Sequence, residues 1–276
     1  MKNGIGLEID ERARLVASLL RELTTAAHGS AALLRGSLAE GRADAYSDID
    51  FVALAEEGDH AAVVAAWRQL VESIAPVVFW QERRMSWTLL NAVTEDWLRC
   101  DLTVFQPGAL RGRARDTVKP LVDRGGYYDA LPETLPPAQP NAQQVGYLIN
   151  EFIRVMGLLP VGIGRGEYVV GVTGTGLLRD MLIQLLTEEV PMPDKGGVLH
   201  LSRVLPEADM RLLEGLPYPR PDRAEIIAAN IATARAFFPR ARALAARIGV
   251  PWPAAFEDAT RRNLQRTLGA EADVSW

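Results

Sequence analysis

The chain has 276 residues, 48% hydrophobic and 24% charged, which is the composition of a globular protein long enough for two domains. No uninterrupted apolar run approaches the roughly 18 residues of a membrane span, and acidic residues interrupt any secretory signal near the N-terminus, so we expect a cytoplasmic protein. The net charge of -5 arises within residues 1–136, which hold 20 acidic and 15 basic side chains, and no Lys/Arg-rich run indicates nucleic-acid binding.

Helical and strand patterns alternate in the first half of the chain. Apolar side chains at helical spacing predict amphipathic helices over Leu7–Ala27 and His60–Ala75. Short segments rich in apolar and β-branched residues predict strands at Ala31–Arg35, Ser47–Leu54, Val77–Gln81, Trp87–Leu90 and Arg99–Phe105. We therefore expect a mixed β-sheet with flanking helices.

Proline fills four of the ten positions from Leu131 to Pro140, which suits an extended connection. We place a domain boundary there, with one domain over 1–135 and a second over 136–276. In the second domain, a stripe of apolar residues beginning at Val145 predicts a helix. Further helices are expected near 173–189, 222–248 and 253–268. The predicted fold class is α+β, a mixed-sheet domain followed by a C-terminal α-helical domain.

The glycine-rich segment Gly171–Gly176 invites comparison with a phosphate-binding loop. It lacks the Gly-Lys-Ser/Thr ending of a P-loop and does not match the Gly-x-Gly-x-x-Gly pattern. We expect it to begin a helix that is capped by Thr173 or Thr175.

A glycine, a serine and two aspartates surround the start of the second predicted strand. Gly36 and Ser37 follow the first strand, and ten residues separate them from Asp48 and Asp50. A glycine there lets backbone N–H groups approach an anion, and the Ser37 hydroxyl adds a donor, so we interpret this turn as phosphate-binding. Side chains alternate along a strand, so Asp48 and Asp50 share one side, where their repulsion and their hard oxygen ligands favour magnesium.

A third acid, Asp101, lies in the strand predicted over Arg99–Phe105. An acid among core-like neighbours is costly unless it is paired or metal-bound, so we consider both a functional role and an ion pair with Arg99. Cys100 points to the opposite side and is expected to be a small buried hydrophobe. As the single cysteine it excludes an internal disulfide, and the three histidines are too scattered for a zinc site.

Together, the Gly36-Ser37 pair, the two acids Asp48 and Asp50 and the strand acid Asp101 resemble the signature of the polymerase-beta-type nucleotidyltransferase superfamily. Within that group the chain is similar to the small antibiotic nucleotidyltransferases, which adenylylate hydroxyls of aminoglycosides or lincosamides. The resemblance implies a nucleotidyltransferase fold and a catalytic role for the first domain, and acceptor binding by the helical domain. Gly36 and Ser37 would bind the triphosphate, Asp48 and Asp50 would hold magnesium, and Asp101 would be a third ligand or the general base.

Two assignments stay open. Glu82, at the end of a predicted strand, is a second candidate for the base. Many relatives carry an arginine a few residues after the Gly-Ser pair, whereas here Glu40 precedes Gly41 and Arg42. Arg42 and Arg35 are therefore both candidates for contact with the phosphates.

The expected reaction is magnesium-dependent transfer of a nucleoside monophosphate, AMP in the first instance, from ATP or another nucleoside triphosphate to a small hydroxylated acceptor, with release of pyrophosphate. The expected acceptor is an aminoglycoside or lincosamide antibiotic. Two alternatives remain: the same chemistry on a tRNA or a protein, as in toxin-like transferases, and a non-catalytic nucleotide-binding module. An RNA substrate should need a basic groove, which the sequence does not indicate. The sequence does not determine the oligomeric state, and a homodimer is one possibility.

The helical domain offers candidates for acceptor contact but no motif. Glu151 or Glu167 could bind a cationic aminoglycoside, whereas a more apolar pocket would suit a lincosamide. Several aromatic side chains could line such a pocket, although most are expected in the core: Tyr147, Phe152, Phe237 and Trp252.

Overall fold

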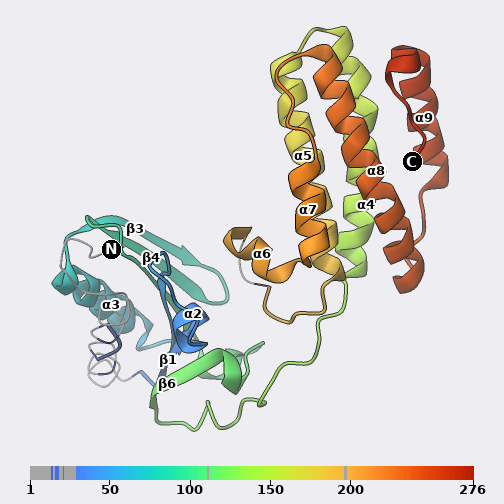
Figure 1. Ribbon diagram of the computed structural model, residues 1–276. Coiled ribbons are helices and arrows are strands. Elements are labelled where there is room, and N and C mark those ends of the chain that lie inside the picture. The colour runs from blue at the N-terminus through green and yellow to red at the C-terminus, as the bar shows by residue number, and fades with distance from the viewer. Residues whose placement is uncertain (1–13, 15, 19–20, 22–28, 111, 196–197) are drawn as a thin grey trace. The chain divides into compact units, whose positions relative to one another are not determined.

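The computed structural model describes residues 14, 16–18, 21, 29–110, 112–195 and 198–276, and the chain divides into two compact units, Met1–Leu135 and Pro136–Trp276 (Figure 1). Each unit has a hydrophobic core of its own. Of the helix expected over Leu7–Ala27, the few described residues are helical, and the rest lies outside the described residues.

The N-terminal unit is built on a six-stranded mixed sheet with the order β3-β4-β5-β2-β1-β6. Its strands are β1 (Ala31–Arg35), β2 (Ile49–Leu54), β3 (Val77–Arg84), β4 (Thr88–Thr94), β5 (Arg99–Phe105) and β6 (Val118–Asp123). β2 and β5 run parallel, and all other neighbouring strands are antiparallel. The expected mixed sheet is confirmed.

Two strands depart from the sequence prediction. β4 continues beyond Leu90 to Thr94, through asparagine, alanine, valine and threonine residues whose side chains alternate between half-buried and buried positions. β6 was not expected because Pro120 interrupts its apolar pattern. A proline lacks the N–H that a central strand needs, but β6 lies at the edge of the sheet, where that donor is dispensable.

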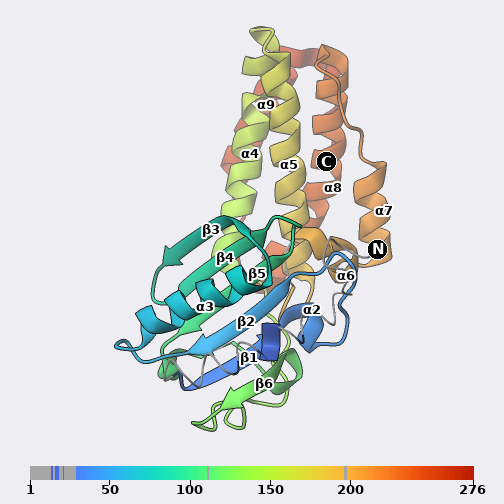
Figure 2. The same ribbon diagram turned by 90° about the vertical axis from the view of Figure 1, so that its left-hand side faces the viewer.

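Helix α3 (His60–Ile74) covers one face of the sheet (Figure 2). Its buried side chains recur at helical spacing and pack against apolar residues of β2, β4 and β5. Phe51 of β2 meets Trp67 of α3 edge to face, with ring centroids 5.8 Å apart, and both side chains are fully buried. The opposite face holds a smaller apolar cluster around Leu33, Val52 and Leu54. This asymmetry leaves part of the second face free for polar side chains.

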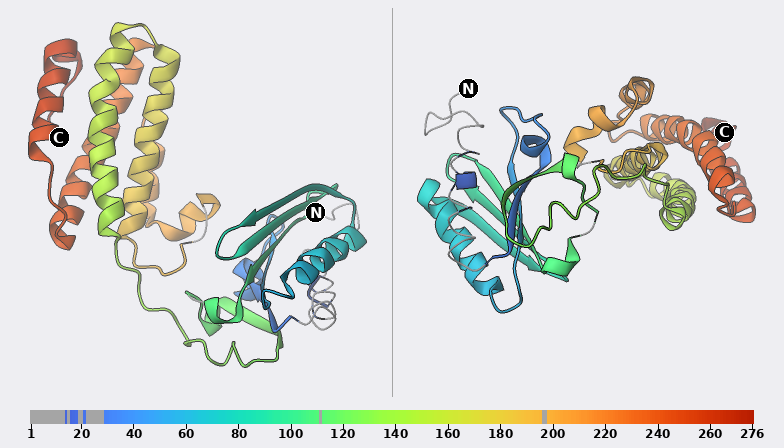
Figure 3. Two further views of the ribbon diagram at one scale, coloured as in Figure 1. Left: turned by 180° about the vertical axis from the view of Figure 1, so that it is seen from behind. Right: turned by 90° about the horizontal axis from the view of Figure 1, so that it is seen from below.

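The second unit is a bundle of long helices (Figure 3). Its helices are α4 (Ala142–Gly164), α5 (Tyr168–Glu189), α6 (Leu201–Val204), α7 (Glu207–Gly215), α8 (Arg223–Ile248) and α9 (Ala254–Leu268). α4, α5 and α8 pack on one another, and α9 packs on α4. Side-chain oxygens of Asn141 and Asp222 accept backbone N–H bonds at the starts of α4 and α8. The expected C-terminal helical domain is confirmed.

The expectation for the glycine-rich segment was wrong. α5 begins at Tyr168, so Thr173 and Thr175 lie inside the helix and do not cap it. The Thr175 hydroxyl donates to the carbonyl oxygen of Gly171, one turn earlier. A Cβ on Gly171 would stand 2.9 Å from Cδ1 of Ile226, so this glycine lets α5 and α8 approach closely. The short helices α6 and α7 were also not expected from the sequence.

Among the described residues, two helices, α4 and α5, are long and apolar enough to cross a membrane by length and composition. Core helices of globular proteins share this length and composition. Both helices contribute a row of fully buried side chains to the helical core, which accounts for their apolar composition.

Replacing Phe51 by alanine tests the packing of α3 on the sheet. The change should lower the free energy of unfolding by about 3–5 kcal/mol, because it opens a cavity beneath Trp67. Chemical denaturation followed by circular dichroism measures the loss. Phe79→Ala on the edge strand β3, where 46% of the side chain is exposed, should cost much less. Equal losses in the two variants would contradict this account of the core.

Candidate active site

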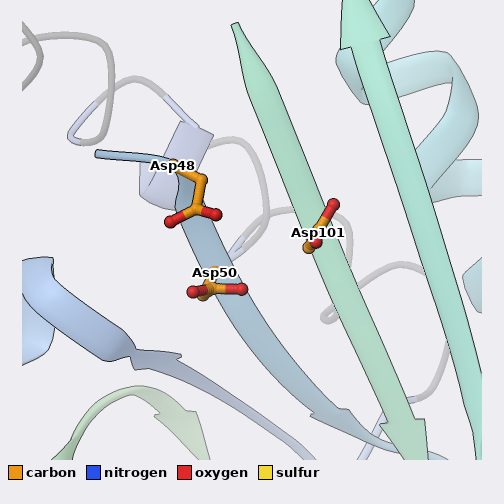
Figure 4. Close-up of side chains that lie close together, drawn as sticks. All are labelled: Asp48, Asp50 and Asp101. Atoms are coloured by element: carbon orange, nitrogen blue, oxygen red, sulfur yellow. The ribbon is translucent and has the colours of Figure 1, made fainter. Parts of the chain in front are cut away.

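Parallel pairing of β2 with β5 brings three aspartates together. Asp50 lies opposite Asp101 in the register of the two strands, so both side chains project from the same face. Asp48 precedes Asp50 by two residues, and one carboxylate oxygen from each of the three lies within 4.8 Å of the others. Figure 4 shows the three carboxylates grouped on these neighbouring strands. Among the described residues, no other group of three or more acidic, histidine or cysteine side chains meets this geometry.

The Gly36 turn lies directly beside Asp50. β1 pairs with β2 so that Arg35 stands opposite Asp50, and the chain then turns at Gly36 into the short helix α2 (Gly36–Ala39). Gly36 has a φ of +69°, in the left-handed region, and a Cβ there would stand 2.8 Å from Oδ2 of Asp50. Only glycine satisfies both constraints, so the start of α2 approaches the acidic cluster closely.

Burial and mutual repulsion perturb the acids. Burial raises the pKa of Asp50 from 3.8 to about 6; Arg35 opposes the shift, and the charges of Asp48 and Asp101 add to it. Burial also raises the pKa of Asp101, against a hydrogen bond from Asn91 that lowers it. The cluster therefore concentrates negative charge on a partly buried surface, and a bound cation would relieve the repulsion.

Arg99 contacts the outer member of the cluster. Its Nη1 lies 3.5 Å from Oδ2 of Asp48, and its Nη2 donates to the carbonyl oxygen of Tyr46 at 3.0 Å. The ion pair considered between Arg99 and Asp101 is thus formed with Asp48. These contacts tie the segment before β2 to β5.

Sequence reasoning missed Asn91, which contacts Asp101, and Arg83, which contacts Asn91. Asn91 of β4 pairs with Asp101 across the sheet, and its Nδ2 donates to Oδ2 of that acid at 2.7 Å. Arg83 of β3 donates from Nη2 to Oδ1 of Asn91 at 2.9 Å. No sequence signal indicated Asn91, because the predicted strand ended at Leu90 and strands disfavour asparagine.

The remaining candidates differ in their partners and in the face of the sheet that they occupy. Arg35 is the cross-strand neighbour of Asp50, whereas Arg42 forms an ion pair with Glu40. Glu82 pairs with Leu90 in the register of β3 and β4, and Leu90 belongs to the core beneath α3. Glu82 is therefore on the opposite face from the three aspartates, where Arg84 contacts it at 3.2 Å.

Cys100 is buried among the apolar side chains on the α3 side of the sheet, as expected.

The aromatic side chains considered for an acceptor pocket lie in the helical unit. Phe152 and Phe237 are fully buried and stack with ring centroids 3.8 Å apart, so they belong to the core. Tyr147 is exposed, and the indole of Trp252 donates to Glu257.

The sequence model of the streptomycin adenylyltransferase family matches residues 14–266, most of the chain. The chain belongs to this family. The protein is therefore a nucleotidyltransferase, as its resemblance to the polymerase-beta-type superfamily implied, and the non-catalytic alternative is set aside. No curated protein matches the chain significantly.

Solved structures show a more distant likeness. An aminoglycoside 6-adenyltransferase from Bacillus subtilis is 14% identical, with a TM-score of 0.43, and the match covers 93% of this chain and 98% of that one. The Cid1 poly(U) polymerase is 16% identical over 37% of this chain and 33% of its own, with a TM-score of 0.28. Terminal uridylyl transferase 4 from Trypanosoma brucei is 16% identical over 80% and 63%, with a TM-score of 0.27. Likenesses this low do not by themselves establish a shared fold.

The raised pKa of Asp50 predicts how stability depends on pH. In the unfolded chain Asp50 ionises near 3.8, but in the folded, metal-free protein it ionises near 6, so its contribution to stability falls as the pH rises between these values. Asp50→Asn removes this penalty and should raise the free energy of unfolding at pH 7 by up to about 3 kcal/mol, with little gain at pH 4.

Thermal unfolding in the presence of a chelator, at both pH values, measures this effect. The exposed Asp129→Asn is the matched control and should leave stability unchanged. An Asp50→Asn variant that is less stable than the wild type at pH 7 would show that the acid is not under electrostatic strain.

Proposed function

We propose that this protein transfers AMP from ATP to a hydroxyl of an aminoglycoside antibiotic, with magnesium bound and pyrophosphate released, and that streptomycin is the first acceptor to test. The observation that carries the proposal is the convergence of three carboxylates within 4.8 Å, beside the Gly36 turn. Membership of the streptomycin adenylyltransferase family supports the nucleotide and the acceptor class.

The acidic cluster fits a magnesium ion. Its donors are carboxylate oxygens, which are the hard ligands that magnesium prefers, and they project from one face of the sheet. Asp48, Asp50 and Asp101 would hold the ion. When bound, magnesium would neutralise charge on the triphosphate and favour attack at the α-phosphorus.

The turn after β1 would bind the triphosphate. The first N–H groups of a helical turn have no partner within it, and α2 begins beside Asp50, where the lack of a Cβ on Gly36 lets the backbone approach the acidic cluster. Ser37 would add its hydroxyl. Arg35 already faces the cluster, whereas Arg42 would have to leave Glu40 to reach the phosphates, so we favour Arg35 for this contact.

Asp101 would act as the general base. Its carboxylate lies opposite Asp50 on the neighbouring strand, so one of its oxygens would accept the proton of a hydroxyl that approaches the cluster. The acceptor oxygen would bond to the α-phosphorus while its proton passes to Asp101. The bond between the α-phosphorus and the bridging oxygen would break, and pyrophosphate would leave. Glu82 is on the wrong face of the sheet for this role.

We further propose that the helical unit binds the acceptor. Among its acidic candidates, Glu151 is held by Arg154 at 2.6 Å, whereas Glu167 is exposed at the start of α5. Glu167 is therefore the freer partner for a cationic aminoglycoside. A lincosamide is the second candidate for the acceptor, since the reaction of its hydroxyl with ATP is the same.

We also infer that the protein is cytoplasmic, where ATP is present.

The test is a substrate panel. Purified protein, magnesium and ATP are incubated with streptomycin, other aminoglycosides, a lincosamide or total tRNA, and both pyrophosphate release and adenylylated product are measured. Streptomycin should turn over, and a chelator should stop the reaction. Asp48→Asn and Asp50→Asn should abolish transfer, and Asp101→Asn should slow it on the order of 10² to 10⁴-fold. Asp129→Asn is the control. Transfer to tRNA alone would overturn the proposed acceptor.

A pair of glycine variants tests the phosphate-binding turn. Gly36 and Gly41 have nearly the same φ, +69° and +71°, but only at Gly36 would a Cβ meet another group, Oδ2 of Asp50. Both alanine variants therefore carry backbone strain, and only Gly36→Ala should lose transfer activity as well. Equal activity in the two variants, measured as kcat/KM for ATP, would argue against a role for this turn.

A further inference from the structure

Asn91 links the acidic cluster to a cation on the edge strand. It lies on β4, between β3 and β5, and projects from the same face as Asp101. Its Nδ2 donates to Oδ2 of Asp101 at 2.7 Å, and its Oδ1 accepts from Nη2 of Arg83 at 2.9 Å. The amide of Asn91 therefore donates to an anion and accepts from a cation.

This arrangement fixes the orientation of the amide. If the Asn91 side chain flipped, its NH₂ would face the guanidinium donors of Arg83, and its oxygen would face the Asp101 carboxylate. Both contacts would become repulsive, so the NH₂ group stays directed at Asp101. Charge-assisted hydrogen bonds of this kind are stronger than neutral ones.

The bond to Asn91 also sets which part of Asp101 is available. Asp101 is flanked on one side by Asp50, an anion, and on the other by Asn91, a donor. The amide engages Oδ2 and leaves Oδ1 for other partners. Without a donor at position 91, the carboxylate would be free to turn away from its charged neighbour.

We propose that Asn91 is a positioning residue for nucleotidyl transfer, which holds the Asp101 carboxylate in the orientation that completes the acidic cluster, and that Arg83 acts through Asn91. The inference rests on the proposed function and deepens it. Partners that orient metal-site carboxylates typically contribute about 10- to 100-fold to metal affinity or activity.

The first test uses Asn91→Leu, which keeps the size of the side chain and removes the donor. The kcat for AMP transfer should fall about 10- to 100-fold, with a much smaller change in KM for ATP. The affinity of the nucleotide-free protein for Mn²⁺, measured by electron paramagnetic resonance, should fall as well. An Asn91→Leu variant with wild-type kcat and wild-type Mn²⁺ affinity would overturn the proposal.

Arg83 offers a graded series with a matched control. Arg83→Gln should weaken Mn²⁺ binding and kcat less than Asn91→Leu does, and Arg83→Lys, which retains a cationic donor, should recover most of the loss. Arg84→Gln is the control, because Arg84 follows on the same strand but contacts Glu82 and His60 on the opposite face. A loss in Arg84→Gln equal to that in Arg83→Gln would show a general effect on β3 and contradict the proposal.

A double-mutant cycle separates positioning from a structural role. If Arg83 acts through Asn91, adding Arg83→Gln to Asn91→Leu should cause no further loss of kcat. Fully additive losses would overturn the link. The Mn²⁺ measurement also keeps the two proposals apart. A wild-type protein that transfers no AMP defeats the proposed function, whereas Mn²⁺ affinity lowered by Asn91→Leu still supports the positioning of Asp101.

Discussion

The parallel pairing of β2 with β5 is the constraint on which the rest of the site depends. In this register Asp50 and Asp101 are direct neighbours across two strands, and Asp48, just before β2, brings its carboxylate to the same cluster. Like charges placed opposite each other destabilise a sheet. The strands accept this because their other faces are buried against α3, where Phe51 and Trp67 form part of a continuous apolar core. One face of the sheet supplies most of the apolar packing, and the other carries the three acids proposed for catalysis.

The surroundings of the acids reduce the strain without removing it. Arg35 and Arg99 oppose the rise in the pKa of Asp50, and Asn91 opposes that of Asp101, but burial outweighs them. A stronger set of fixed cations would stabilise the empty cluster and compete with a metal ion for the same oxygens. The residual repulsion would thus favour binding of the proposed divalent cation.

Charges serve a different purpose in the helical unit. Arg240 bonds both Glu189 and Asp209, which joins α8 to α5 and α7, and the buried Glu257 accepts from Arg242 and Arg261. Here each buried acid has a cation within contact distance, so the groups fix the packing of helices. The contrast with the three aspartates, which are crowded together with fewer cations, separates structural acids from those proposed for catalysis.

Local patterns in the sequence determined much of this protein. Helical spacing predicted α3 and the long C-terminal helices, and alternation along β2 placed Asp48 and Asp50 on one face, because these periods are set by backbone geometry. Gly36 was identifiable from its place after a strand. The arrangement of strands that are distant in sequence was decided only by the tertiary structure. Glu82 faces away from the acids, Asn91 donates a hydrogen bond to Asp101, and β6 forms one edge of the sheet. Strand register depends on which segments pair across the sheet, and no local period specifies that pairing.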